Sequence, residues 1–182
     1  MGLETEFKKV KLFVGFIYSH RQLCEDIKQK LEQRFSPVDM ESVEFPFEKT
    51  TYYNDEMGTQ LFKRFFSFGT LISPEELPDI KILTNRIEIE NAISGQRAIN
   101  IDPGFLSDAN VILATTKNHY HRVPLAKGIY AHIEYVIKKR NTLTVMEWTY
   151  PDFRTPEYMD FFIRLISRYK EDIKKLRVKN VE

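Results

Sequence analysis

The segment KNHYHR, residues 117–122, places a lysine, two histidines and an arginine close together in the chain. Lys117 offers a point charge, Arg122 a two-pronged donor and a protonated His121 a third donor, so the set suits a phosphate or another anion. His119 and His121 could instead chelate a metal, but a metal site needs a third ligand. A solvated loop is the remaining interpretation. We adopt the anion site, with no metal, and take His121 as the proton-transfer candidate because histidine titrates near neutral pH.

Two more charged residues, Arg97 and Asp102, lie on the segment that precedes the strand leading into KNHYHR. Consecutive strands are usually neighbours in a sheet, so we expect Arg97 and Asp102 to share a pocket with Lys117. Asp102 opens the sequence DPG, and our first interpretation is that it caps a turn. Glu56 is predicted in the first turn of a helix, where an acid complements the helix dipole. Both acids are also candidates to orient or complement His121.

A further polar group lies on a hairpin that we predict for residues 128–152. A short turn pairs Lys138 with Leu143, and this register sets Glu134 directly opposite Glu147. Two facing carboxylates repel each other unless water, a cation or a shared proton lies between them. The face is therefore either an acid pair or metal cradle that binds a ligand, with His132 beside it, or the solvated side of a sheet that buries one face. The ligand-binding interpretation uses Tyr130, His132, Glu134 and Glu147.

The elements that must position these residues follow from hydrophobic periodicity. Apolar residues three or four apart predict helices, and β-branched, aromatic or alternating runs predict strands. The predicted helices cover residues 19–35, 54–68, 73–93 and 155–176. Within the third, the stretch RIEIEN also alternates as a strand would, and we favour the helix. The predicted strands cover residues 10–18, 42–48, 97–102 and 110–116, with a turn at 102–108 and the hairpin at 128–152. This order predicts one α+β domain over residues 1–182, a mostly antiparallel sheet with a C-terminal β-hairpin and helices packed on the sheet.

The composition excludes several classes of protein. Hydrophobic residues make up 42% of the chain and charged residues 29%, as in a globular rather than a disordered protein. A net charge of +1 argues against a dedicated nucleic-acid-binding protein. No apolar run is long enough to cross a membrane and the N terminus lacks a signal-peptide pattern, so we expect a cytoplasmic protein without a membrane partner. The single cysteine, Cys24, lies beside an apolar helical stripe and is expected to be buried and unreactive.

The chain also lacks the motifs of several common enzymes. It contains no G-x-x-x-x-G-K-[ST] phosphate loop, no G-x-G-x-x-G dinucleotide fingerprint and no H-E-x-x-H zinc motif. It contains no G-x-S-x-G nucleophile elbow. The motifs therefore name no reaction, and the cofactor stays unknown.

A series of longer motifs spans nearly the whole chain in the order TTYYNDEMG, TNRIE, GQRAINIDPGFL, ILATTKNHYHRVPLAKGIYA and EWTYPDFR. Together they resemble a bacterial family known as domain of unknown function number 4416. The resemblance implies no established activity; some members are labelled GTP-binding proteins, but TTKNH here differs from the guanine-reading motif N-K-x-D. It does imply that the family's signature includes Glu56, Arg97, Asn100, Asp102, Lys117, His121, Arg122, Tyr130 and Trp148.

Two functions remain open at this point. The first is a cytoplasmic enzyme or binding protein for a phosphorylated or otherwise anionic small molecule, nucleotides included, held by Arg97, Lys117 and Arg122. The second is a non-catalytic interaction or dimerisation module, whose polar clusters would be solvated. A ligand site brings Arg97, Lys117 and His121 into one concave pocket, whereas a module scatters them. The sequence does not decide between enzyme and binding protein, and a homo-oligomer is open.

Overall fold

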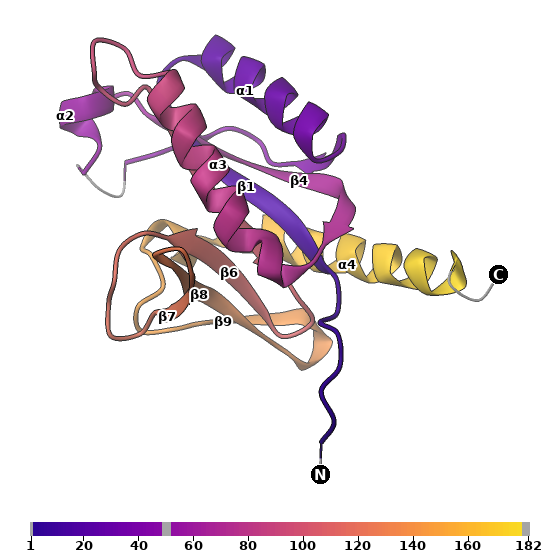
Figure 1. Cartoon of the computed structure of the whole chain (residues 1–182). Coiled ribbons are helices and arrows are strands. Elements are labelled where there is room, and N and C mark those ends of the chain that lie inside the picture. Colours follow the sequence, from indigo (N-terminus) through magenta and orange to yellow (C-terminus); the bar gives the residue numbers. More distant parts are fainter. Residues whose placement is uncertain (1, 49–51, 180–182) are drawn as a thin grey trace.

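The computed structural model describes residues 2–48 and 52–179 (Figure 1). The strands are β1 (Val10–Tyr18), β2 (Val38–Glu41), β3 (Phe45–Pro46), β4 (Phe62–Ile72), β5 (Ile99–Leu106), β6 (Asn110–Thr115), β7 (Val123–Ala126), β8 (Ile129–Lys138) and β9 (Thr142–Val145). The helices are α1 (Arg21–Arg34), α2 (Asn54–Met57), α3 (Leu77–Glu90) and α4 (Pro156–Lys179), with 3₁₀ turns η1 (Pro74–Glu76), η2 (Lys139–Asn141) and η3 (Asp152–Arg154). Within the described residues these strands form one antiparallel sheet in the order β2-β4-β1-β5-β6-β8-β7, with β3 beside β4 and β9 beside β8. The predicted α+β fold is confirmed.

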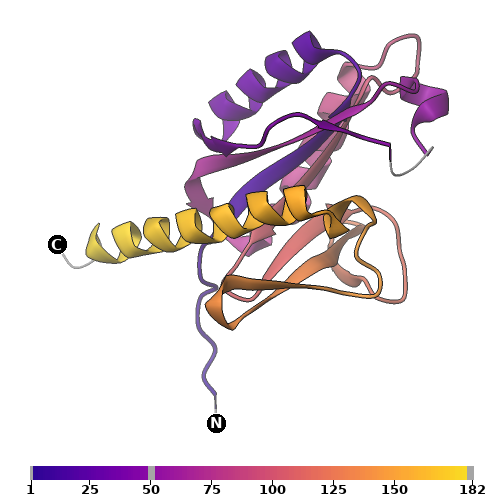
Figure 2. The same cartoon turned by 180° about the vertical axis from the view of Figure 1, so that it is seen from behind.

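Helices cover both faces of the sheet. α1 and α3 lie on one face (Figure 1), and α4 crosses the other (Figure 2). Successive side chains of β1 alternate between the two layers: Phe16 packs in the buried cluster beneath α1 and α3, and Phe13 in the cluster beneath α4. Because β1 is buried on both sides, its sequence VKLFVGFIY is apolar almost throughout.

The prediction of a helix over residues 54–68 is wrong. Only α2, four residues long, is helical, and an eleven-residue strand, β4, begins at Phe62. The helix layers cover both faces of β4: Phe65 packs in the cluster beneath α4, and Phe66 and Phe68 pack in the cluster beneath α1 and α3. A strand with apolar residues on both faces has no period of two, and its closely spaced aromatics also satisfy the helical period.

The turn predicted at residues 102–108 is also wrong. β5 continues through Pro103 and Gly104 to Leu106, so Asp102 lies within a strand and caps no turn. β5 pairs with β1 along its whole length but pairs with β6 only from Gly104 to Leu106. Pro103 has no N–H to donate to a neighbouring strand, so a proline there favours an interrupted ladder. The two strands therefore separate on the N-terminal side of Gly104, and the space between them becomes the cavity described below.

The hairpin of β8 and β9 forms, but its register differs from the prediction by one residue. Lys138 pairs with Thr142 rather than with Leu143, because the turn contains three residues, two of which adopt a positive φ of 60°. A one-residue slip moves each side chain to a new partner and face. β9 ends at Val145, and Glu147 beyond it is exposed while Glu134 is completely buried. The predicted acid pair is therefore absent.

Between the parts of β8 that pair with β7 and with β9, side chains form the hydrogen bonds that a neighbouring strand would otherwise provide. β7 pairs with the first residues of β8 and β9 with the last, so the carbonyl groups of Ile133 and Glu134 face no strand on that edge. The indole N–H of Trp148 donates to the carbonyl of Ile133 (3.0 Å), and the hydroxyl of Thr149 donates to that of Glu134 (2.6 Å). Residues 148–149 are thereby fixed against β8.

Two other predictions agree with the structure. The helix expected over residues 73–93 is present as η1 followed by α3, and the N–H of Ser73 donates to Glu76 (2.7 Å), as in a capping box. Cys24 is fully buried, and burial raises the pKa of its thiol to about 11; its low reactivity stays a prediction. No helix in the described part of the chain is long and apolar enough to cross a membrane.

We expect Gly104→Ala to lower the free energy of unfolding by about 1–3 kcal/mol, the usual cost of overpacking. A Cβ at Gly104 would lie 2.3 Å from the carbonyl oxygen of Ile112 and 2.6 Å from the ring of Phe13, and a backbone atom cannot move aside cheaply. Gly69→Ala is the matched control, since a Cβ there would meet its nearest atom at 3.6 Å. Urea denaturation measures the free energy of unfolding of both variants. Equal values for Gly104→Ala and Gly69→Ala would contradict the close approach of β5 and β6.

Candidate functional site

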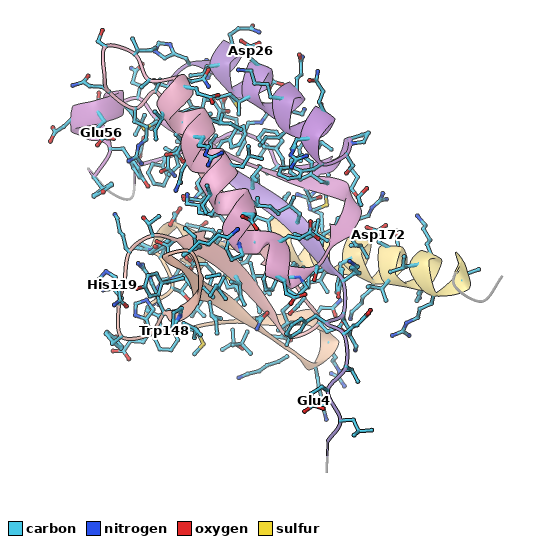
Figure 3. All side chains as sticks on the ribbon, in the orientation of Figure 1. Glu4, Asp26, Glu56, His119, Trp148 and Asp172 are labelled. Atoms are coloured by element: carbon cyan, nitrogen blue, oxygen red, sulfur yellow. The ribbon has the colours of Figure 1, made fainter. Side chains whose placement is uncertain are left out.

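A cavity of about 450 Å³ opens where β5 and β6 separate, within the range typical of ligand pockets. Its walls come from β5, β6 and α3, and from the segments that follow β6 and β9. Figure 3 shows Glu56 and His119 on the same side of the molecule. The cavity lies on this side as well, because two of its lining residues are close to the labelled ones. Arg97 forms an ion pair with Glu56, and Lys117 precedes His119 by two residues.

The register of three adjacent strands sets the floor of the cavity. Ile17 of β1 pairs with Lys63 of β4 on one side and with Asn100 of β5 on the other. Directly paired residues project from the same face of a sheet, so these three side chains lie in one row. Asp102 lies in the next row on the same face, beside Gly15, which has no side chain.

Cations outnumber acids among the described side chains that line the cavity. The four cations are Lys63, Lys81, Arg97 and Lys117. The three acids are Glu88, Asp102 and Asp152. The lining side chains alone therefore carry one more cation than acids, and an excess of cations attracts anions. Glu56 lies just outside the lining and balances Arg97.

Lys63 is fixed as a buried ion pair. Its ammonium group donates to the carboxylate of Asp152 at 2.5 Å, and both residues are buried. Four aromatic rings surround the ammonium with their centroids 4.6–5.4 Å away: Phe47, Phe65, Phe153 and Tyr158. Both the carboxylate and the ring faces attract the ammonium group, so Lys63 is held in a fixed position at one end of the cavity.

A chain of hydrogen bonds crosses the cavity from α3 to Arg97. Lys81 of α3 donates to the carbonyl of Ile101 (2.8 Å) and to Asp102 (3.3 Å). The side-chain amide N–H of Asn100 donates to the other carboxylate oxygen of Asp102 (2.6 Å), and the guanidinium of Arg97 donates to Oδ1, the side-chain oxygen of Asn100 (2.8 Å). These side chains are therefore ordered before any ligand enters.

Lys117 differs from the other three cations. Its ammonium group lies 4.0 Å above the ring of Tyr52, and it forms no ion pair with a carboxylate of the described residues. Lys63, Lys81 and Arg97 each have a carboxylate partner. The positive charge that the cavity does not compensate is thus located at Lys117.

Glu88 is an acid of the cavity whose pKa is shifted by burial. One carboxylate oxygen accepts the N–H of Ile101 (2.8 Å) and lies 3.9 Å from Lys81, and the other lies 3.8 Å from Arg97. Burial raises the pKa of Glu88 to about 7, despite the two cations that oppose this shift. A carboxyl group that titrates near neutral pH can both accept and donate a proton there.

Aromatic side chains form the remaining wall: Phe47, Tyr52, Tyr53 and Tyr150. Burial raises the pKa of Tyr150 to about 12 and raises the pKa of Tyr53 as well, so both hydroxyl groups stay neutral at pH 7. Planar rings next to charged groups suit a ligand that has a flat or apolar part beside its polar one.

The histidines and the arginine of KNHYHR lie behind this wall rather than in the cavity. The guanidinium of Arg122 is buried and donates to the hydroxyl of Tyr150 (2.9 Å), whose ring does line the cavity. The ring of His121 stacks on Trp148, with centroids 5.0 Å apart and planes 7° from parallel. Burial, with smaller contributions from His132 and Arg122, lowers the pKa of His121, which disfavours its protonated form.

The structure separates the predicted site residues into two groups. Those that line the cavity together are Arg97, Asp102 and Lys117. Those that lie outside it are Glu56, His121, Arg122, Tyr130, His132, Glu134 and Glu147. Within the second group, Glu56 lies 3.3 Å from Arg97, Tyr130 is half-buried on β8, and Glu147 is exposed. The described chain contains no group of three or more histidine, cysteine or acidic side chains placed to hold a metal.

The contribution of α3 to the cavity was not predicted from the sequence. Lys81, Asn85 and Glu88 line the cavity from this helix, which was predicted only as one of the helices packed on the sheet. Their spacing of four and three residues places them on one helical face, so a polar stripe along a mostly apolar helix is the signal that could have found them. Lys63 and Asp152 give no comparable signal, because their pairing depends on the strand assignment of β4.

The fold and the cavity define an antiparallel α+β domain with a charged pocket between two central strands that separate. The chain belongs to the family described as Domain of unknown function (DUF4416), whose model matches residues 8–169. The match includes every cavity residue named above. Comparison with curated proteins and with solved structures finds no match.

We expect the stability of Glu88→Gln, relative to the unmodified protein, to rise with pH. The pKa of Glu88 is raised from 4.5 to about 7 on folding. The folded state therefore disfavours the carboxylate form of Glu88. The contribution of Glu88 to the free energy of unfolding is greatest below pH 4.5, and it falls by at most about 3 kcal/mol as the pH rises through about 7. The Glu88→Gln variant does not lose this stability, because glutamine cannot ionise.

Urea denaturation at pH 5 and pH 8 measures the effect, with Glu90→Gln on the exposed side of α3 as the control. A stability difference between Glu88→Gln and the unmodified protein that does not change with pH would contradict the burial of an ionisable Glu88.

Proposed function

We propose that the cavity between β5 and β6 binds a small molecule carrying a phosphate or another anionic group. The observation that supports this most strongly is Lys117, whose charge lacks an acidic partner among the described residues while the other cavity cations have one. An anion next to Lys117 would form a charge-assisted hydrogen bond at the edge of a partly desolvated pocket, where such bonds are strong.

The rest of the cavity suggests the other half of the ligand. Tyr53 and Tyr150 offer flat surfaces, and Asn85, Asn100 and Asp102 offer hydrogen-bonding groups. A molecule with a planar polar ring and an anionic group, such as a nucleotide, satisfies both requirements. Because the chain has no phosphate loop, side chains rather than a glycine-rich backbone would hold the anion.

The cavity also supports proton-transfer chemistry. We assign this role to Glu88 rather than to His121, because Glu88 lines the cavity and its pKa lies at about 7, whereas His121 lies behind the wall. Asp102, bound to Asn100 and Lys81, is the second acid within reach of a ligand. Glu56 would act indirectly, through its ion pair with Arg97.

A second function, as an interaction or dimerisation module, is favoured by one feature. β7 lies at the edge of the sheet with all four residues exposed, Val123 and Leu125 among them, next to the highly exposed Tyr120. Exposed apolar edge strands pair readily with another chain. Light scattering after size-exclusion chromatography distinguishes a dimer from a monomer.

We expect Lys117→Met to weaken anion binding by at least about tenfold, because a hydrogen bond to a charged group contributes about 1.5–3 kcal/mol. Thermal-shift screening against inorganic phosphate, sugar phosphates and nucleotides identifies the ligand, since a ligand at about 100 times its Kd stabilises the fold by about 2.7 kcal/mol. Calorimetry then compares the Kd values of the variants, and added salt should weaken binding.

Lys30→Met is the matched control, since it removes one exposed lysine from α1, far from the cavity in sequence and in fold. It should bind as the unmodified protein does. The proposal fails when no anion in the screen raises the melting temperature, or when both lysine variants bind with unchanged affinity.

A further inference from the structure

We infer that Arg122 is a positioning residue for this cavity: it holds in place the two wall segments that carry Lys117 and Tyr150. That role rests on the proposed function, because it concerns what the walls are placed to bind. Arg122 itself lies outside the cavity and is only 9% exposed. Its charge is therefore directed at the protein, and its effect on a ligand must pass through its neighbours.

The guanidinium of Arg122 joins three parts of the chain. Its Nη1 donates to the carbonyl of Lys117 in the segment after β6 (2.8 Å). Its Nη2 donates to the hydroxyl of Tyr150 in the segment after β9 (2.9 Å). Its Nε donates to Nδ1 of His132 on β8 (3.1 Å). Only arginine presents donors in three fixed directions, so a lysine at this position cannot make the same set of bonds.

His132 and Glu134 give this arrangement a rigid base, since both are completely buried on β8. Nδ1 of His132 accepts from Arg122, which leaves the ring proton on Nε2, 3.0 Å from a carboxylate oxygen of Glu134. The two atoms are close, although their alignment is not that of a good hydrogen bond. Burial raises the pKa of Glu134, although His132 favours its charged form.

Tyr150 is held at three points, two of them on His132 and Glu134. Its backbone N–H donates to the second carboxylate oxygen of Glu134 (3.1 Å). Its ring stacks on His132, with centroids 4.6 Å apart and planes 16° from parallel. Its hydroxyl accepts from Arg122. One face of the cavity is thus built on β8 through the contacts with Glu134 and His132, and Arg122 links Tyr150 to the segment of Lys117.

The chain contains an internal reporter of this arrangement. Its single tryptophan, Trp148, stacks on His121, which belongs to the same segment as Lys117 and Arg122. Nε2 of His121 also lies 3.2 Å from Nδ1 of His132. Release of the segment from Arg122 should therefore change the stacking on Trp148 and hence its fluorescence.

The test is a double-mutant cycle on the affinity for inorganic phosphate, measured by calorimetry. We expect Arg122→Met to weaken binding by about tenfold, as for the loss of one or two hydrogen bonds. Arg122→Lys should restore little of this loss, although it keeps the charge. In the Lys117→Met background, Arg122→Met should have almost no further effect, because Arg122 acts through Lys117. The positioning role would be overturned if the two substitutions changed the Kd for phosphate by independent, multiplying factors. It would also be overturned if Arg122→Lys bound phosphate as tightly as the unmodified protein.

A ligand-free measurement separates this role from the proposed function. Hydrogen exchange and Trp148 fluorescence are compared in Arg122→Met, in the milder Tyr150→Phe and in the unmodified protein. We expect faster exchange over residues 116–122 in Arg122→Met and unchanged exchange over α1. Tyr150→Phe should change exchange there less, because it removes one of the three acceptors. If the unmodified protein binds no phosphate but the segment loosens as described, the proposed ligand is wrong and the positioning role stands; unchanged exchange over residues 116–122 would refute the role.

Discussion

β5 pairs with β1 over its whole length but with β6 only from Gly104 onward, and the candidate site depends on this difference. Pro103 removes one donor from the ladder, and Gly104 lets the two strands approach closely where they do pair. On the other side of this point the strands separate, so Asn100 and Asp102 face open space instead of a neighbouring strand. Lys81 on α3 reaches the same space and binds the carbonyl of Ile101, which has become accessible there.

The charges around this opening are arranged so that most of them are already satisfied. Burying an ion costs several kcal/mol unless a partner compensates it. Lys63 has Asp152, and Lys81 has Asp102, so these groups hold fixed positions without a ligand. Side chains ordered in advance lose little entropy on binding, which favours affinity. An anion at Lys117 would complete the arrangement at the cost of ordering only one long side chain.

The types of several site residues were visible in the sequence, but their arrangement was not. Lys117 was expected to share a pocket with Arg97 and Asp102 because the strands that carry them are consecutive, and it does. Arg122 was expected in the same pocket, but its guanidinium donates to Lys117, His132 and Tyr150 and lies behind the wall. Glu88 was missed because helical periodicity shows which face is polar but not what that face meets. The helix predicted over residues 54–68 failed because a strand buried on both faces carries no alternation.

The most direct test of an anion site in this cavity is diffraction from crystals grown with tungstate. Tungstate is a tetrahedral anion that can be located by its anomalous scattering. The structure predicts one strong peak in the cavity between β5 and β6, within hydrogen-bonding distance of the ammonium group of Lys117. The peak should disappear in Lys117→Met crystals and persist in Lys30→Met crystals. An empty cavity, with tungstate found only at other cationic surfaces such as the last turns of α4, would contradict the assignment of this cavity as an anion site.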